Sequence, residues 1–129
     1  MAVSYEATFP SSPPGVGAMR REVAAFAANA GMDEKGVGSV RLAVSEAATN
    51  AVVHAYRQSD GELRVQAYVA DGELVVVVGD TGLGLAPRPD SPGLGLGMPL
   101  MASVTSSFRV VSEGAGTEIH MAFALPHDA

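Results

Sequence analysis

The first half of the chain has hydrophobic residues at helical spacing. They recur every three or four positions over 16–30 and again from Asp33 to about Tyr56, which is the period of an amphipathic helix. Gly31 lies between these stretches and favours the end of the first helix, while Asp33 is a good capping residue for the second. A short strand is expected before both helices, at 3–9, and a loop rich in Pro, Ser and Gly is expected at 10–17. The first half therefore predicts one strand followed by two helices.

The second half has strand-like spacing instead. Alternating apolar and polar residues are typical of a half-buried strand, and this spacing or a continuous apolar run occurs at 62–69, 73–79, 108–112 and 117–125. Asp71-Gly72 predicts a tight hairpin turn between the first two strands, and a short helix is expected at 98–104. Strands joined mostly by hairpins, with helices that need one face covered, predict an α/β fold. We expect a single domain over 1–129, a two-layer α/β sandwich with a mixed, mainly antiparallel sheet covered by helices.

Composition excludes several classes of protein. The chain has 129 residues, of which 47% are hydrophobic, and this suits a single packed core. Its net charge is −6 and its few basic residues are scattered along the sequence. The chain therefore lacks the clustered positive charge of a protein that binds double-stranded nucleic acid. It has no cysteine for a disulfide or a thiolate metal site. No apolar run approaches the roughly 20 residues of a membrane span, and no secretory signal is recognisable, so we expect a cytoplasmic protein.

Glu46 and Asn50 are the first candidates for chemistry. They are four residues apart in the expected second helix, so they share one face about one turn apart. Mg²⁺ prefers oxygen ligands and shares the phosphates of its substrate, so the amide oxygen of Asn50 can be the protein's direct ligand. A carboxylate one turn earlier can accept the proton of the hydroxyl or water that attacks the terminal phosphate. The alternative is that both residues form a solvated polar face.

Asp80 ends an apolar strand and begins the pattern Asp-x-Gly-x-Gly, with Gly82 and Gly84. A carboxylate buried at a strand end needs a hydrogen-bond donor, and the exocyclic amine of adenine is such a donor. The two glycines would let the backbone approach the base without a side-chain clash. The alternative is an ordinary turn.

A second glycine motif contains Gly93, Gly95 and Gly97 and precedes the expected short helix. Backbone N–H groups in such a loop can turn toward one anion, so phosphate is its natural ligand, and a surface loop is the alternative. A dinucleotide fingerprint is excluded because Met98 stands where its last glycine is required. A P-loop is excluded because the one lysine of the chain lies far away.

The order of these motifs resembles the ATP site of the GHKL superfamily, which includes gyrase and histidine kinases. The segment 46–56 comes first, then the two glycine motifs, then Thr117 after a glycine. The resemblance covers about 16–125 and implies the GHKL/Bergerat ATP-binding fold, with ATP and Mg²⁺ as cofactors. It also implies that the Thr117 hydroxyl bonds to Asp80 or to the adenine edge, and that His54 has a structural role.

Within the superfamily, the chain resembles the bacterial anti-sigma-factor serine/threonine kinases, because it has Asn-Ala-x-x-His-Ala-Tyr at 50–56, Gly-Leu-Gly-Leu at 93–96 and a short loop between its glycine motifs, and because we expect a stand-alone domain. That resemblance implies a homodimer that binds a sigma factor and phosphorylates a serine or threonine of an antagonist (anti-anti-sigma) protein. Arg88, in the short loop, is our candidate for steadying the terminal phosphate. Relatives often have an acidic residue after the second glycine motif, whereas 101–107 has none, and this departure concerns the partner surface.

Three functions are compatible with these motifs. A kinase would use Glu46 as the base, Asn50 as the Mg²⁺ ligand and Asp80 as the adenine anchor. A regulatory module would bind nucleotide or sequester a protein partner without transferring phosphate, and a structural domain would bind no nucleotide. Glu46 favours the enzyme, because a pure binder needs no base there. We expect no direct binding to nucleic acid or to a membrane.

Overall fold

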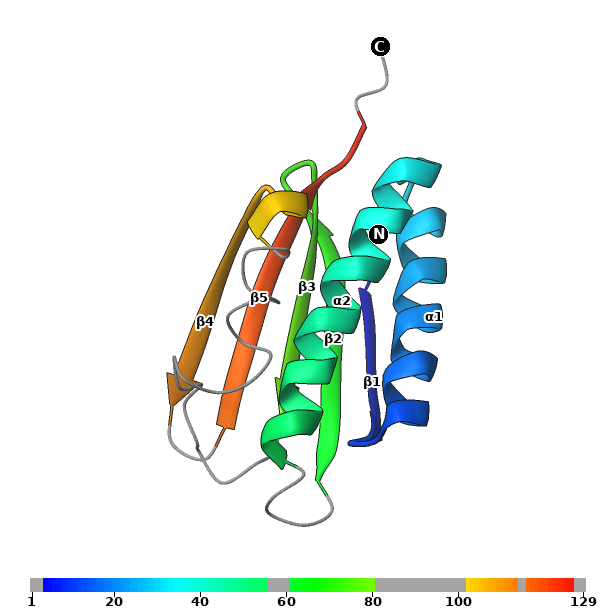
Figure 1. Cartoon of the computed structure of the whole chain (residues 1–129). Helices are drawn as coiled ribbons and strands as arrows, with labels where there is room; N and C mark the ends of the chain where they lie inside the picture. Colours follow the sequence, from blue (N-terminus) through cyan, green and yellow to red (C-terminus); the bar gives the residue numbers. More distant parts are fainter. Residues whose placement is uncertain (1–3, 56–60, 81–101, 114–115, 127–129) are drawn as a thin grey trace.

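The computed structural model describes residues 4–55, 61–80, 102–113 and 116–126. In this part of the chain two long helices lie against one five-stranded sheet (Figure 1). None of the helices in these ranges is long and apolar enough to cross a membrane. The elements in chain order are β1 (Ser4–Pro10), α1 (Pro13–Asn29), α2 (Glu34–Ala55), β2 (Glu62–Ala70), β3 (Glu73–Asp80), β4 (Ser107–Glu113) and β5 (Gly116–Ala124).

The strands lie in the order β1-β2-β3-β5-β4, and each neighbouring pair is antiparallel. The pairs β2–β3 and β4–β5 are those expected from the spacing of the sequence. The pair β3–β5 joins these two units into one sheet, and β1 extends it at the edge beside β2. The two-layer sandwich is therefore confirmed. The sheet was expected to be mixed and mainly antiparallel, and every described pair is antiparallel.

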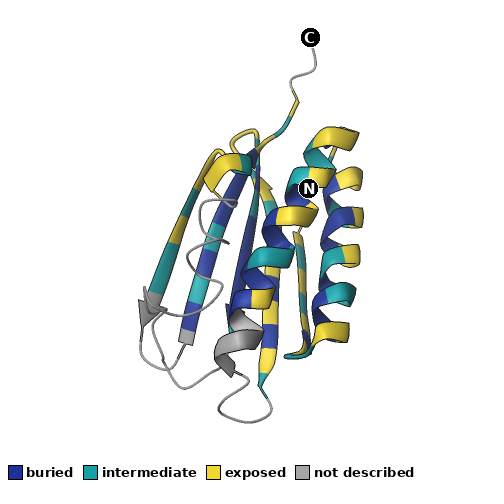
Figure 2. Ribbon diagram, in the orientation of Figure 1, coloured by how far each residue is buried: buried dark blue, intermediate teal, exposed yellow. Residues whose placement is uncertain are grey.

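The core lies between the sheet and the two helices, which cover the same face of the sheet (Figures 1 and 2). The alternation predicted for β2 is confirmed at Leu63, Val65 and Ala67, which are at most 1% exposed while the residues between them are exposed. It fails at Val69, which was expected on the same face and is 39% exposed. Burying such apolar side chains is the main stabilising contribution to the fold. The largest side chains of the core with less than 2% exposure include Met19, Val23, Val44, Leu74 and Met121.

The start of α1 differs from the sequence prediction, which treated 10–17 as a loop. The helix begins at Pro13, because proline lacks only an N–H group that the first turn of a helix leaves unpaired. Ser12 caps this end, and its Oγ accepts a hydrogen bond from the Gly15 N–H at 3.3 Å. Gly15 also allows a close approach of the chain, since a Cβ there would lie 1.9 Å from the Pro10 carbonyl oxygen.

Two local predictions are confirmed. Asp33 caps α2, and its Oδ1 accepts a hydrogen bond from the Gly36 N–H at 2.7 Å. The β2–β3 turn has φ angles of 53° at Asp71 and 76° at Gly72, as a two-residue type I′ hairpin requires. Of the short helix expected at 98–104, the described residues 102–104 are helical.

Candidate nucleotide site

Helix α2 positions Glu46 and Asn50 through the residues on its buried face. Val40, Ala43, Val44, Ala47 and Ala48 are fully buried and fix the rotation of α2 against the sheet. Asn50 comes one turn after Glu46 and is 6% exposed, whereas Glu46 is half-buried. The pair is therefore not the solvated polar face considered as an alternative, because Asn50 lies at the boundary of the core.

The Asn50 amide has unused hydrogen-bonding capacity. Its Nδ2 atom is buried and has no hydrogen-bond partner in the described part of the chain. Buried polar groups in folded proteins are nearly always satisfied, and leaving one unpaired costs about 1–3 kcal/mol. The Asn50 amide lies at the edge of the core, and its unpaired donor could form a hydrogen bond with a polar ligand. Asn50 thus meets a structural condition for contact with a metal–nucleotide complex.

Asp80 and Thr117 lie side by side on neighbouring strands. Gly79 of β3 is paired with Glu118 of β5, and Asp80 and Thr117 are each one residue further toward the same end of the sheet. Their side chains project on the helix-covered face, opposite to the side chain of Glu118. Thr117 is 7% exposed and Asp80 is half-buried. Asp80 was expected to be buried, and it is instead partly exposed.

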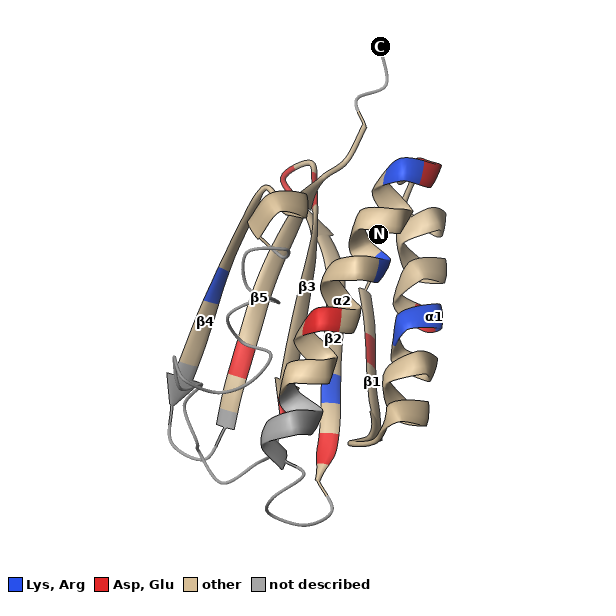
Figure 3. Cartoon of the chain, in the orientation of Figure 1, with Lys and Arg blue, Asp and Glu red and all other residues tan. Residues whose placement is uncertain are grey.

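The predicted residues converge although they are distant in sequence. The C-terminal ends of α2 and β3 and the start of β5 all lie at one end of the molecule (Figure 1). Asn50, near the end of α2, and Asp80 and Thr117 of the sheet therefore lie toward this end, and Glu46 lies one helical turn further from it. The basic side chains of the described chain are dispersed over α1, α2, β2 and β4 and do not gather at this end (Figure 3).

Six predicted site residues lie outside the described ranges: Gly82, Gly84, Arg88, Gly93, Gly95 and Gly97. Their contacts to base and phosphates stay predictions, as does the structural role of the His54 side chain.

The structure adds one polar atom that the sequence did not indicate. Ser11 follows β1, and its buried Oγ has no hydrogen-bond partner among the described residues. Its backbone N–H donates to the Gly61 carbonyl at 3.1 Å, which fixes the chain between β1 and α1. In the sequence Ser11 belongs to a Ser-Ser-Pro-Pro run that indicates only a turn or a cap.

Comparison with known proteins gives one family. Residues 9–123 match the family model of the histidine kinase-like ATPase domain. An anti-sigma F factor of Clostridium acetobutylicum is 36% identical over 123 residues, which cover 84% of this chain and 86% of that protein. An anti-sigma F factor of Clostridium kluyveri is 30% identical over 114 residues, covering 79% and 80%.

Solved structures agree at the level of the fold. The RsbU and RsbW domains of a Mycobacterium tuberculosis protein match with a TM-score of 0.77 and 24% identity, covering 98% of this chain and 34% of that one. The histidine kinase domain of a blue-light activated kinase from Erythrobacter litoralis matches with a TM-score of 0.61, covering 85% and 61%. With the family model spanning nearly the whole described fold, the chain belongs to the histidine kinase-like ATPase domain family, within the GHKL group that its motifs resemble.

Proposed function

We propose that this chain is an ATP-dependent serine/threonine protein kinase that acts as an anti-sigma factor. Support comes from the family and from relatives named anti-sigma F factors, which match over most of both chains. The protein would use ATP with Mg²⁺ in the cytoplasm. It would bind a sigma factor as a homodimer and phosphorylate a serine or threonine of an antagonist protein.

The observation that carries this proposal is the buried Asn50 amide, one helical turn from Glu46. Its Nδ2 is unpaired within the described structure and could donate a hydrogen bond to a phosphate oxygen, while its amide oxygen is of the kind that Mg²⁺ accepts beside water and phosphate. When bound, Mg²⁺ and ATP would supply the terminal phosphoryl group and the positive charge that stabilises its transfer. Asn50 would hold the metal, and Asp80 would accept a hydrogen bond from the adenine amine.

Glu46 would be the proton acceptor. It is half-buried on α2, so it is accessible to a substrate while its orientation is fixed by the buried face of the helix. The hydroxyl oxygen of the protein substrate would bond to the terminal phosphorus as the bond from phosphorus to the leaving ADP oxygen breaks. The hydroxyl proton would pass to the Glu46 carboxylate.

Phosphate transfer tests the proposal. The purified chain is incubated with Mg²⁺, ATP labelled on its terminal phosphate and a heat-treated extract of the cells that contain it, and labelled amino acids are then separated. Phosphoserine or phosphothreonine is expected with the parent and with Glu34→Ala. Glu34 lies in the first turn of the same helix and is exposed, so this variant is a matched control.

Glu46→Ala should lower labelling by about 10²-fold or more, the range for removing a general base, while nucleotide still binds. Equal labelling by Glu46→Ala and the parent would contradict the role of Glu46. Nucleotide binding without any labelled acceptor, together with undiminished capture of a protein partner by Glu46→Ala, would favour the regulatory module instead.

A further inference from the structure

The two edges of the sheet differ in how well they are protected. β1 forms one edge and β4 the other, because the strand order is β1-β2-β3-β5-β4. α1 packs beside β1: the Tyr5 hydroxyl donates a hydrogen bond to Glu22, and the centroids of the Tyr5 and Phe26 rings lie 6.0 Å apart. β1 also ends at Pro10, which has no N–H group to offer another strand. The edge at β1 is therefore partly blocked.

The edge at β4 lacks these protections in the part of the chain that the structure describes. β4 contains no proline, and its register with β5 is continuous, without a bulge. It is the strand furthest from α1 (Figure 1). Every second residue of an edge strand directs its N–H and C=O groups away from the sheet, and no described strand pairs with those of β4. The outer edge of β4 can therefore accept one more strand.

The side chains of β4 alternate between the two sides of the sheet. Phe108 and Val110 pair with the buried Met121 and Ile119 of β5, so they point to the side that α1 and α2 cover. Both pack against the core and stay partly exposed. Arg109 points to the opposite side, which we call the open side, and it is exposed. A strand added beside β4 would thus meet an apolar, a basic and an apolar side chain in turn.

The charge of Arg109 is not neutralised by an ion pair with any described residue. Its cross-strand neighbour is His120, whose Nε2 lies 3.0 Å from Oε1 of Glu118. The acidic side chain that β5 presents on the open side is therefore engaged with the histidine. A groove of about 210 Å³ opens beside Arg109, where Tyr68 and Ala122 also line it. Within the described chain, the Arg109 guanidinium is thus available to a carboxylate.

We propose that the outer edge of β4 binds an extended segment of another protein, in which one acidic residue lies between two apolar residues. The segment would form a sixth strand through backbone hydrogen bonds to β4, a common mode of peptide binding. Its acidic side chain would lie beside Arg109, and its apolar side chains would lie beside Phe108 and Val110. The pattern reads the same in both directions, so it fits a parallel or an antiparallel strand.

This surface is separate from the proposed nucleotide site. Arg109 points to the open side, whereas the side chains of Asp80 and Thr117 lie on the helix-covered side. The inference therefore goes beyond the proposed function and does not rest on it. Peptide binding by a protein that fails to bind Mg-ATP would refute the kinase alone, and Mg-ATP binding without peptide binding would refute the β4 surface alone.

A synthetic peptide tests the proposal. The probe is a fluorescein-labelled peptide with blocked ends and the sequence Ser-Thr-Val-Asp-Val-Thr-Ser, and its binding to the purified chain is followed by fluorescence anisotropy. Saturable binding by the parent is expected. A second peptide with lysine in place of the aspartate should bind about tenfold more weakly, because like charges on paired strands repel each other.

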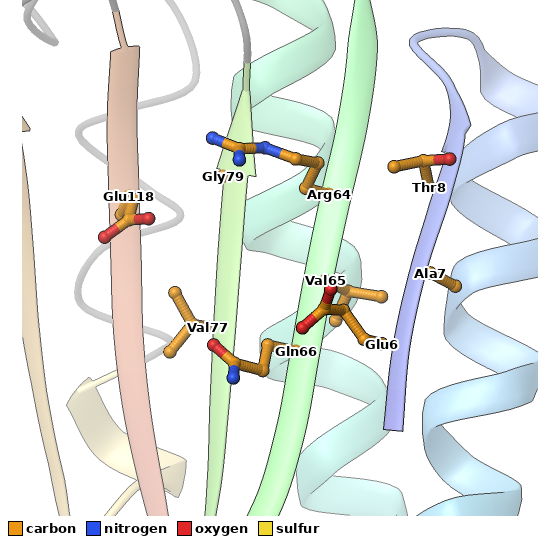
Figure 4. A pocket seen from close by; sticks show the side chains of 9 residues that line it. All are labelled: Glu6, Ala7, Thr8, Arg64, Val65, Gln66, Val77, Gly79 and Glu118. Carbon is orange, nitrogen blue, oxygen red and sulfur yellow. The ribbon is translucent and has the colours of Figure 1, made fainter. Parts of the chain in front are cut away.

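Charge reversal on the protein tests the role of Arg109. Arg109→Glu should weaken binding of the aspartate peptide about tenfold and should prefer the lysine peptide, with circular dichroism to confirm folding. Arg64→Glu is the matched control, since Arg64 is exposed on the open side of β2 and extends toward Gly79 beside a groove of about 280 Å³ (Figure 4). β3 and β5 separate it from β4, so this variant should bind within about twofold of the parent. Equal losses in the two variants, or no loss in Arg109→Glu, would contradict the contact.

Methylation of the peptide backbone tests strand addition itself. Methyl groups on every second amide nitrogen remove the donors of one peptide edge and leave those of the other. Of the two complementary methylated peptides, one should bind like the probe and the other should not bind. Two methylated peptides of equal affinity would overturn strand addition.

Hydrogen exchange locates the bound peptide. The probe should slow amide exchange in β4 and leave β1 unchanged, because only the amides of β4 would gain hydrogen bonds. Unchanged exchange in β4 would contradict the proposed surface. No saturable binding of the probe by the folded parent would overturn the proposal, and Arg109 would then be a charge that only prevents edge-to-edge pairing.

Discussion

Asn50→Leu should make the protein more stable without nucleotide and less stable with it. Leucine has the same branched arrangement of four side-chain heavy atoms as asparagine, and it has no donor to leave unpaired. Removing the unpaired Nδ2 should recover about 1–2 kcal/mol of its desolvation penalty, and the better helix propensity of leucine adds a few tenths. We therefore expect the free energy of unfolding to rise by about 1–2 kcal/mol in the absence of ligand.

Nucleotide should reverse this order. A ligand at about 100 times its dissociation constant stabilises the folded parent by about 2.7 kcal/mol. A variant without the amide would gain little of this, so with Mg-ATP it should be the less stable protein by about 1 kcal/mol.

Urea unfolding followed by circular dichroism, with and without Mg-ATP, measures both effects. Asn29→Leu is the matched control, since it makes the same change at an exposed position in the last turn of α1. Its effect should stay within about 0.5 kcal/mol in either condition. A ligand-free Asn50→Leu variant that is 1 kcal/mol or more less stable than the parent would refute the reasoning about the unpaired donor. Equal stabilisation of variant and parent by Mg-ATP would refute the contact with the nucleotide complex.

Three further predictions concern the fold and are measured by urea unfolding. Leu74→Ala should destabilise the protein by about 3 kcal/mol, since the side chain is 0% exposed and a cavity would remain. Gly15→Ala should lower the free energy of unfolding by about 2 kcal/mol or more, because its Cβ would collide with a backbone carbonyl of β1. Gly38→Ala, whose Cβ would have nothing within 4 Å, should instead stabilise the protein by about 0.5–1 kcal/mol. Equal effects of the two variants would contradict this contrast. Burial, together with the hydrogen bond to Glu22 and its charge, raises the pKa of Tyr5 above its usual value of 10.0. The neutral phenol is thus favoured in the folded state. Its contribution to the free energy of unfolding should be present below about pH 10 and decline above it, and the Tyr5→Phe variant should lack this decline.

Much of the fold could be predicted because its signals are local. The period of α1 and α2, the alternation of β2 and the Asp33 cap each depend on residues within a few positions of one another. The start of α1 was wrong for a local reason as well. Pro13 and Pro14 were taken as loop residues, although proline is well suited to the first turn after a serine cap.

The arrangement of the site depends on non-local packing. Thirty-six positions separate Asp80 from Thr117, and only the pairing of β3 with β5 places them together. Which residues face the open side follows from the same registers, because a shift by one residue would turn each side chain to the other face. The buried, unpaired amide of Asn50 could not be predicted, because burial depends on how α2 lies against the sheet. The resemblance to a known ATP site indicated the residues, and the structure indicates how the pairing of β3 with β5 brings Asp80 and Thr117 together.

Binding of Mg-ATP by the purified chain tests the central claim most directly. Isothermal titration of the parent, Asp80→Asn and Asp71→Asn should show saturable binding by the parent and by Asp71→Asn. Asp71 lies in the β2–β3 turn, where asparagine tolerates the positive φ. Asp80→Asn should bind at least about tenfold more weakly, because an amide is a weaker acceptor for the adenine amine than a carboxylate. No binding by the folded parent, or equal binding by Asp80→Asn, would contradict the nucleotide site.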